Sequence, residues 1–225
     1  MSIDKFLYLL AESKLFLCRA DNLMDAWEGA VLQSHIRTML PAHWDLSVRG
    51  EIGEIIQGYS RQMRKCTYLN CWHINNIESA AMWDACSKKS DSIALRTNVG
   101  RLKRSITTSE TLMIGEVRYA DYESDESLGT LETIRPFFAK RKCFEHEREL
   151  RLIIQNCPIG DDSIGWDDTQ DYMALDVNLL VLIEAVFVSP YAEKWLVSPL
   201  EKILNRMLDS AVPVHRSQLF NFDRQ

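Results

Sequence analysis

Two carboxylates and a guanidinium alternate along one short segment of the chain, as Glu147, Glu149 and Arg151. If residues 147–155 form a β-strand, alternate side chains share a face, so these three charges line up about 6.5–7 Å apart. Leu150 and Leu152 then point to the opposite face. One carboxylate pinned by Arg151 and a second that accepts a proton or stabilises positive charge could divide the work of a polar reaction. A solvated strand face with ion pairs is the alternative.

A second candidate segment follows a predicted buried strand at residues 14–19 and contains Arg19, Asp25 and Glu28. Arg19, at the strand end, could bind a phosphate or carboxylate through two parallel hydrogen bonds, or form an ordinary surface ion pair. Asp25 could serve the site or simply cap a helix that begins at Ala26. Loops after buried strands often carry function, so we keep this segment as a candidate binding element.

A third candidate is aromatic. Trp72 ends a predicted strand and Trp83 lies on the next predicted helix. Two indoles could form a wall for a planar ring such as a nucleobase or nicotinamide, with His73 as a polar neighbour. Packing in the hydrophobic core is the alternative for both.

Composition restricts the protein class. The net charge of -6 argues against broad electrostatic capture of nucleic acid. No apolar run reaches the roughly 20 residues that span a bilayer, and the N-terminal segment resembles an amphipathic helix more than a signal peptide. We therefore expect a cytoplasmic protein without a membrane partner. The six cysteines lack metal-binding spacing, so neither a metal site nor a disulfide is expected.

The elements that must position these residues alternate irregularly. We expect helices and strands at the residue ranges that follow. Helices are predicted at 3–13, 26–39, 48–65, 77–87, 99–105, 128–142 and 191–209, and strands at 14–19, 67–73, 92–97, 112–119, 147–155, 172–177, 182–189 and 212–217. This order predicts an α+β fold with a mixed, mainly antiparallel sheet of about seven strands flanked by helices. Residues 1–225 are expected to form a single domain, with an acidic surface loop near 156–170.

Signature motifs of several enzyme classes are absent from the sequence. There is no Walker loop, no G-x-G-x-x-G, no G-x-S-x-G and no H-E-x-x-H. A P-loop nucleotidase, a serine hydrolase and a zinc metalloprotease are therefore set aside.

The candidate segments resemble an uncharacterised bacterial domain family often found beside abortive-infection and other phage-defence genes. Its Asn-Asp-Pro-Phe-Glu element is matched here at Asp25 and Glu28. Its strand ending in Cys-Phe and its Met-Trp-x-x-Tyr helix correspond to Cys71-Trp72 and to the segment of residues 82–86, where Cys86 replaces the tyrosine. Its Val-x-Tyr, lysine and Trp-x-Tyr-Glu-x-Glu-x-Arg elements correspond to residues 117–119, to Lys140 and to residues 144–151.

A second similarity, to ADP-ribosyltransferases, implies a chemistry. Those enzymes carry an Arg or His on a first strand, a polar or aromatic residue on a second, and a Glu-x-Glu or single Glu on a late strand. Arg19, the segment of residues 71–73 and Glu147-x-Glu149 occur in that order, although the Ser-Thr-Ser element of the arginine-specific group is missing. The resemblance implies NAD as substrate, with Glu147 or Glu149 catalytic, Arg19 on a phosphate, and Trp72 or Trp83 stacked on the nicotinamide.

Three functions follow as hypotheses. The first is an intracellular antiphage effector or toxin-like transferase that uses NAD, acts on an unknown macromolecular target and works with a partner defence protein. The second is a non-catalytic sensor that binds a nucleotide or a phage protein. The third is a magnesium-dependent nuclease that uses Glu147, Glu149 and Asp25 as oxygen ligands.

Overall fold

The computed structural model describes residues 1–31, 36, 40–85, 92–122, 124, 132–157, 170–209 and 211–220. The chain forms two compact units, and each is assembled from segments that are separated in the sequence. Unit 1 contains Met1–Leu15, Asn75–Ser109 and Ala174–Gln225, and unit 2 contains Phe16–Ile74 and Glu110–Met173.

The α+β class is confirmed, with a largest sheet of six strands instead of seven. Its strand order is β4-β9-β1-β2-β8-β5, and β1 and β9 each contain residues of both units. The bounds of its strands are β1 Lys14–Arg19, β2 Thr67–His73, β4 Ile106–Thr107, β5 Leu112–Glu116, β8 Glu149–Gln155 and β9 Tyr172–Val177. The pairs β1–β2, β2–β8 and β5–β8 are all antiparallel.

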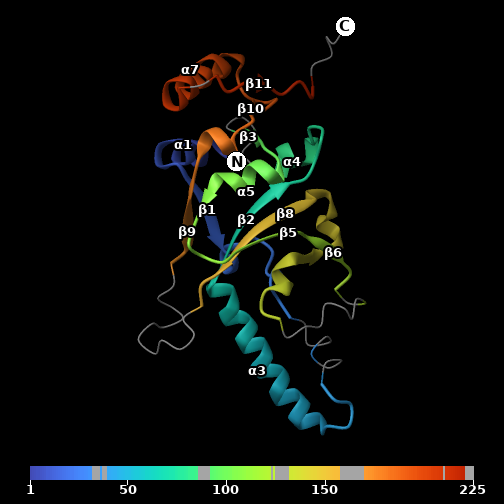
Figure 1. Ribbon diagram of the computed structural model, residues 1–225. Coiled ribbons are helices and arrows are strands. Elements are labelled where there is room, and N and C mark those ends of the chain that lie inside the picture. The colour runs from blue at the N-terminus through green and yellow to red at the C-terminus, as the bar shows by residue number, and fades with distance from the viewer. Residues whose placement is uncertain are drawn as a thin grey trace. The chain divides into compact units, whose positions relative to one another are not determined.

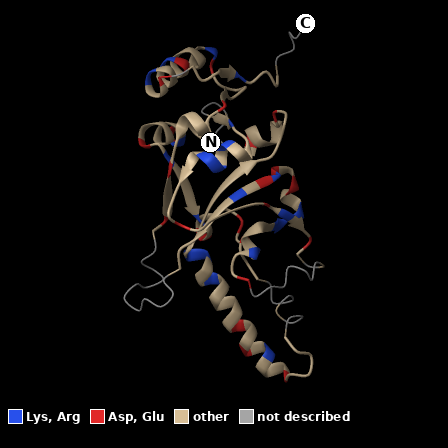
Figure 2. Cartoon of the chain, in the orientation of Figure 1, with Lys and Arg blue, Asp and Glu red and all other residues tan. Residues whose placement is uncertain are grey.

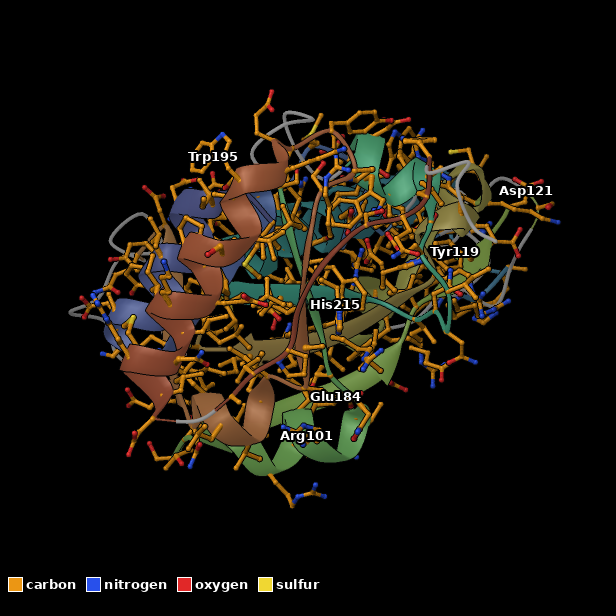
Figure 3. All side chains as sticks on the ribbon, turned by 90° about the horizontal axis from the view of Figure 1, so that it is seen from above. Arg101, Tyr119, Asp121, Glu184, Trp195 and His215 are labelled. Atoms are coloured by element: carbon orange, nitrogen blue, oxygen red, sulfur yellow. A yellow bond between two sulfur atoms is a disulfide. The ribbon has the colours of Figure 1, made fainter. Side chains whose placement is uncertain are left out.

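Unit 1 is built from short helices and a three-stranded sheet (Figure 1). Its helices are α1 Ile3–Glu12, α4 Ala80–Ala85, α5 Val99–Ser105, α6 Leu179–Leu182, the 3-10 turn η7 Lys194–Leu196 and α7 Val197–Leu208. Its small sheet has the order β11-β10-β3, with β3 Ile93–Arg96, β10 Ala185–Val188 and β11 Val214–Arg216. Arg101 on α5 (Figure 3) donates hydrogen bonds to the Leu180 and Ile183 carbonyls and so fixes α5 against α6.

Unit 2 contains the long helix α3 Leu46–Lys65, which leads directly into β2 (Figure 1). Asp45 caps its first turn by accepting a hydrogen bond from the Ser47 amide at 2.8 Å. The remaining elements are the 3-10 turns η1 Ala20–Asn22, η4 Arg135–Phe138 and η5 Lys142–Glu147, and the parallel strands β6 Arg118–Ala120 and β7 Ala139–Arg141. One face of the sheet packs an apolar cluster that includes Leu69, Phe137 and Ile153.

Several predicted elements are wrong. Residues 26–29 form a turn instead of a helix, and most of 32–39 lies outside the described residues. The predicted helix at 128–142 is, where described, η4 followed by β7. The predicted strand at 182–189 begins as α6 and becomes β10 only at Ala185. Most of the predicted acidic loop, residues 158–169, lies outside the described residues.

The predicted absence of disulfides is also wrong, because Cys66 and Cys157 are bonded across 91 positions of sequence. The antiparallel register pairs Thr67 with Gln155, which places these two cysteines just beyond the paired ends of β2 and β8. Their Cα atoms lie 4.9 Å apart, within the range that a disulfide requires. Sequence spacing could not reveal the pair because only the strand register brings it together.

Candidate functional site

The acidic segment begins with a backbone reversal just before β8. Glu147 ends η5, and Arg148 adopts a left-handed conformation with φ 41°. The predicted position of Glu147 on the strand is therefore wrong, since β8 begins at Glu149. His73 fixes this corner through Nδ1, which lies 2.6 Å from the Glu147 carbonyl oxygen.

Glu149 and Arg151 do share one face of β8, as predicted. Arg151 pairs in register with Cys71 on β2 and Gly115 on β5, and Glu149 pairs with His73. Leu150 and Leu152 are buried on the other face. Figure 2 shows acidic and basic residues following each other at the start of β8.

Lys140 is the centre of the site. It lies on β7, which pairs in parallel with β6 so that Lys140 is opposite Tyr119. Its Nζ atom lies 3.0 Å from Glu28 Oε1 and 3.1 Å from Glu149 Oε1, and it also donates a hydrogen bond to Glu147 Oε2. A single buried ammonium thus holds three carboxylates together. This interaction brings Glu147 back to Glu149 although Glu147 is not on the strand.

Arg151 is the second buried cation, with no exposed surface. Nε donates to Glu149 Oε2 at 2.5 Å, and Nη1 donates to the Phe137 carbonyl at 2.8 Å. Nη2 lies 2.5 Å from Glu28 Oε2, an ion pair whose angle lies outside that of a hydrogen bond. Burying a guanidinium is costly without such partners, so these contacts are a condition of the fold.

Glu28 reaches both cations because of the turn that contains it. Gly29 has φ 71°, a conformation that residues with a Cβ atom rarely adopt. A Cβ atom on Gly29 would also lie 2.2 Å from Phe137 Cε1. Ser60 Oγ donates to the Gly29 carbonyl at 3.0 Å and ties this turn to α3.

Asp25 forms an ion pair with Arg141, the third cation of the site. Arg141 Nη2 and Nε lie 2.9 and 3.3 Å from Asp25 Oδ1 and Oδ2, which is a two-point contact. Asp25 also caps its own turn, because Oδ1 accepts from the Trp27 amide at 3.1 Å. Asp25 therefore caps a turn instead of the predicted helix, and it also belongs to this group of charges.

We call the group formed by these residues the charged cluster. Its members are Asp25, Glu28, Lys140, Arg141, Glu147, Glu149 and Arg151, all in unit 2. It contains four carboxyl groups and three cations. The cluster is electrically neutral if one carboxyl group carries a proton.

The pKa values of Glu147 and Glu149 are shifted in opposite directions. Burial and a hydrogen bond with Glu149 raise the pKa of Glu147, against the opposing effect of Lys140. Burial also acts to raise the pKa of Glu149, but Arg151, the hydrogen bond from Glu147 and Lys140 outweigh it and lower that pKa to about 2. Two carboxyl groups in contact, one ionised and one tending to hold its proton, are a typical acid–base arrangement.

Two tyrosines complete the surroundings of the cluster. The Tyr119 hydroxyl (Figure 3) accepts a hydrogen bond from the Glu149 amide at 2.8 Å and fixes the first residue of β8. Tyr122 is buried, and its burial raises the pKa of its hydroxyl to about 12, so the group stays neutral.

Arg19 and Trp72 do not join the cluster, contrary to the prediction. Trp72 pairs in register with Leu150, so it lies on the opposite face from Glu149. Arg19 pairs with Tyr68, which itself pairs with Ile154 on that same opposite face.

Arg19 and Trp83 each have partners of their own. Arg19 forms ion pairs with Asp21 at 2.7 Å and with Asp171 at 2.9 Å. Trp83 belongs to unit 1, where it is buried and its indole donates to Glu78 at 3.2 Å.

Sequence reasoning misses Arg141 as a member of the cluster, together with the Trp27 and Phe144 rings beside its guanidinium, and gives Lys140 no role. It places Lys140 and Arg141 on a predicted helix, and only the parallel pairing of β6 with β7 brings them to the carboxylates. The motif resemblance does contain a signal, because Asp25, Glu28 and Lys140 belong to its quoted elements.

Metal binding is not favoured by the donor set. Each carboxylate of the cluster already contacts an ammonium or guanidinium group. Among the residues that the structure describes, no group of three His, Cys, Asp or Glu side chains is arranged to hold a metal ion. No helix within the described ranges is both long and apolar enough to cross a membrane.

In comparisons with known proteins, no family model, no curated protein and no solved structure matches the chain.

Proposed function

We propose that the chain is an antiphage-defence effector that cleaves the nicotinamide–ribose bond of NAD, with Glu147 as its catalytic carboxylate. One observation carries the proposal. Glu147 is the most exposed carboxylate around Lys140, with 19% of its side chain exposed against 10% for Glu149 and 4% for Glu28. It is therefore the carboxylate that a substrate can reach, and the others hold it in position.

The chemistry suits this arrangement. When the C–N bond breaks, its electron pair stays with the pyridinium ring, which leaves as neutral nicotinamide. The ribose carbon becomes oxocarbenium-like, and a nearby carboxylate stabilises this cation. A water molecule or a nucleophilic side chain of the target then adds to this carbon. The proton that it loses passes to the ionised carboxylate of Glu147. Lys140 and the ionised Glu149 stay in place throughout.

The proposal differs from the sequence-based expectation in its binding residues. Arg19 and Trp72 lie on the opposite face of the sheet and have no role in it. Glu149 becomes a positioning residue, because Lys140 and Arg151 occupy both of its oxygens.

The experiment compares Glu147→Gln with Glu145→Gln. Glu145 is an exposed carboxylate on the same turn η5 and is outside the cluster, so it controls for a change of charge. Purified proteins are incubated with NAD and cell extract, and nicotinamide release and target modification are followed by mass spectrometry. We expect Glu147→Gln to abolish release, while calorimetry shows NAD binding within about tenfold, or ~1.4 kcal/mol, of the parent.

Growth arrest on overexpression gives a second readout. Glu147→Gln should relieve it, and Glu145→Gln should not. If the parent neither binds NAD nor releases nicotinamide with any extract, the transferase function is refuted.

A non-catalytic sensor is the second candidate, and the charge balance of the cluster favours it. The four carboxyl groups and three cations are almost fully paired with one another, which favours a rigid binding surface. In a sensor, Glu147→Gln would change ligand affinity and no turnover would exist. A magnesium-dependent nuclease has less support, because Asp25, Glu147 and Glu149 would first have to leave their cations.

A further inference from the structure

Arg141 differs from the other two cations of the charged cluster. Lys140 contacts three carboxylates, and Arg151 contacts two carboxylates and a carbonyl. Arg141 contacts one carboxylate, Asp25, through Nε and Nη2. Its Nη1 donors have no protein partner among the described residues, and 36% of its side chain is exposed.

Two aromatic rings flank this guanidinium. Arg141 Cζ lies 5.3 Å from the centroid of the Phe144 ring and 5.6 Å from that of the Trp27 ring. Both contacts are within the range of cation–π attraction. Asp25 holds one edge of the guanidinium while the rings restrict its faces, so its remaining edge is presented in a defined direction.

The Phe144 ring also connects Arg141 to the proposed catalytic group. Lys140 Nζ lies 4.7 Å from the same ring centroid, and Lys140 donates to Glu147. The half-buried guanidinium and the partly exposed Glu147 carboxyl group therefore belong to one continuous set of interactions. A ligand with an anionic group and a reacting carbon could engage both.

We propose that Arg141 is the anion-binding residue of this site and takes the phosphate of a nucleotide, with Trp27 and Phe144 as stacking surfaces for a planar ring. A fixed guanidinium with a free edge matches phosphate oxygens through two parallel hydrogen bonds. Trp27 is 42% exposed, so its ring is open to a base. The assignment rests on the proposed function for the identity of the ligand, but the subsite itself does not.

Inorganic pyrophosphate, AMP and NAD are the probes, each titrated into the full chain by calorimetry. We expect Arg141→Gln to weaken pyrophosphate and AMP binding at least tenfold. Arg141→Lys should keep only part of the parent affinity, because an ammonium group cannot donate two parallel hydrogen bonds to a phosphate. Trp27→Ala should weaken AMP binding more than pyrophosphate binding, because only AMP carries a base that can stack on the ring. Arg135→Gln is the matched control, since Arg135 is an exposed arginine of the same unit with one carboxylate partner. It should leave all three affinities unchanged.

Removing Arg141 leaves Asp25 buried without its cation, so Arg141→Gln could fail to fold. The double variant Asp25→Asn with Arg141→Gln removes both charges and keeps a hydrogen-bonding pair. It should fold and still lose the anion. If the folded double variant binds pyrophosphate and AMP like the parent, or if the parent binds neither, the subsite is refuted. If the parent binds both but never releases nicotinamide, the subsite stands and the proposed function fails.

Discussion

Glu28 and Arg151 meet in the interior of unit 2, where Glu28 Oε2 lies 2.5 Å from Arg151 Nη2 and Arg151 has no surface exposed to solvent. One comes from an irregular turn and the other from strand β8, which lies between β2 and β5. Since Glu28 also binds Lys140, a single carboxylate joins both buried cations. The predictions below test this network and its supports.

The first prediction concerns the stability of that bridge. Glu28→Gln leaves Lys140 and Arg151 each short of a charge in a buried environment, and breaking a buried pair in this way costs about 3–5 kcal/mol. The free energy of unfolding from denaturant titration measures the loss. Glu132→Gln breaks the exposed pair of Glu132 with Arg135 and should cost less than about 1 kcal/mol. Equal losses of unfolding free energy in the two variants would show that the buried network stabilises the fold no more than an exposed ion pair does.

The second prediction concerns pH. The pKa of Glu149 falls from 4.5 to about 2 on folding, so its contribution to stability is complete above pH 4.5 and is lost as pH falls toward 2. The pKa of Glu147 is raised above 4.5, so its contribution is complete below 4.5 and is lost as pH rises through the folded pKa.

The stability contributions of Glu147 and Glu149 therefore change with pH in opposite directions, and this difference distinguishes the two residues. Unfolding free energies measured across that range should lose part of their acid dependence in Glu149→Gln. Glu147→Gln should gain stability relative to the parent as pH rises above 4.5. Identical pH profiles of both variants and the parent would contradict the opposite pKa shifts of Glu147 and Glu149.

The third prediction concerns the disulfide. The bond between Cys66 and Cys157 closes a loop of 91 positions, for which chain entropy gives a stabilisation of roughly 4–5 kcal/mol. Replacing Cys157 by Ser should therefore lower the unfolding free energy by an amount of that order. Thiol titration of the denatured parent should find two more thiols after reduction than before. An unchanged count would show that the bond does not form.

The fourth prediction concerns the turn that carries Glu28. Gly29→Ala must place a Cβ atom at a positive φ and 2.2 Å from Phe137 Cε1, which should cost about 2–5 kcal/mol in strain and repacking. Gly50→Ala is the control, because Gly50 lies inside α3 with nothing within 4 Å of an added Cβ. It should be neutral or stabilise by up to about 1 kcal/mol. Comparable losses in both variants would mean that Phe137 does not restrict this turn.

Elements with a clear local pattern are predicted well. The strands Lys14–Arg19, Thr67–His73 and Tyr172–Val177 and the helix Val99–Ser105 have the bounds expected from the sequence. Their apolar period and β-branched content are properties of a few consecutive residues. The segment of residues 135–147 is predicted poorly, because its short β7 exists only through pairing with β6.

The sequence by itself determined how the groups of the site that are neighbours in the chain are oriented relative to one another. Glu149 and Arg151 share a face because the side chains of a strand alternate, and no tertiary contact is needed for that conclusion. Asp25 caps its own turn for an equally local reason.

Only the tertiary structure decided which of these groups meet. The register of β2 against β8 turns Trp72 away from Glu149, and the pairing of β1 with β2 turns Arg19 away as well. The pairing of β7 with β6 brings Lys140 to three carboxylates. Glu147 and Glu149 are close together in the chain, but Glu28 is far from both. Strand register and long-range ion pairs depend on the energy of the whole packed unit, and therefore no local stretch of sequence encodes them.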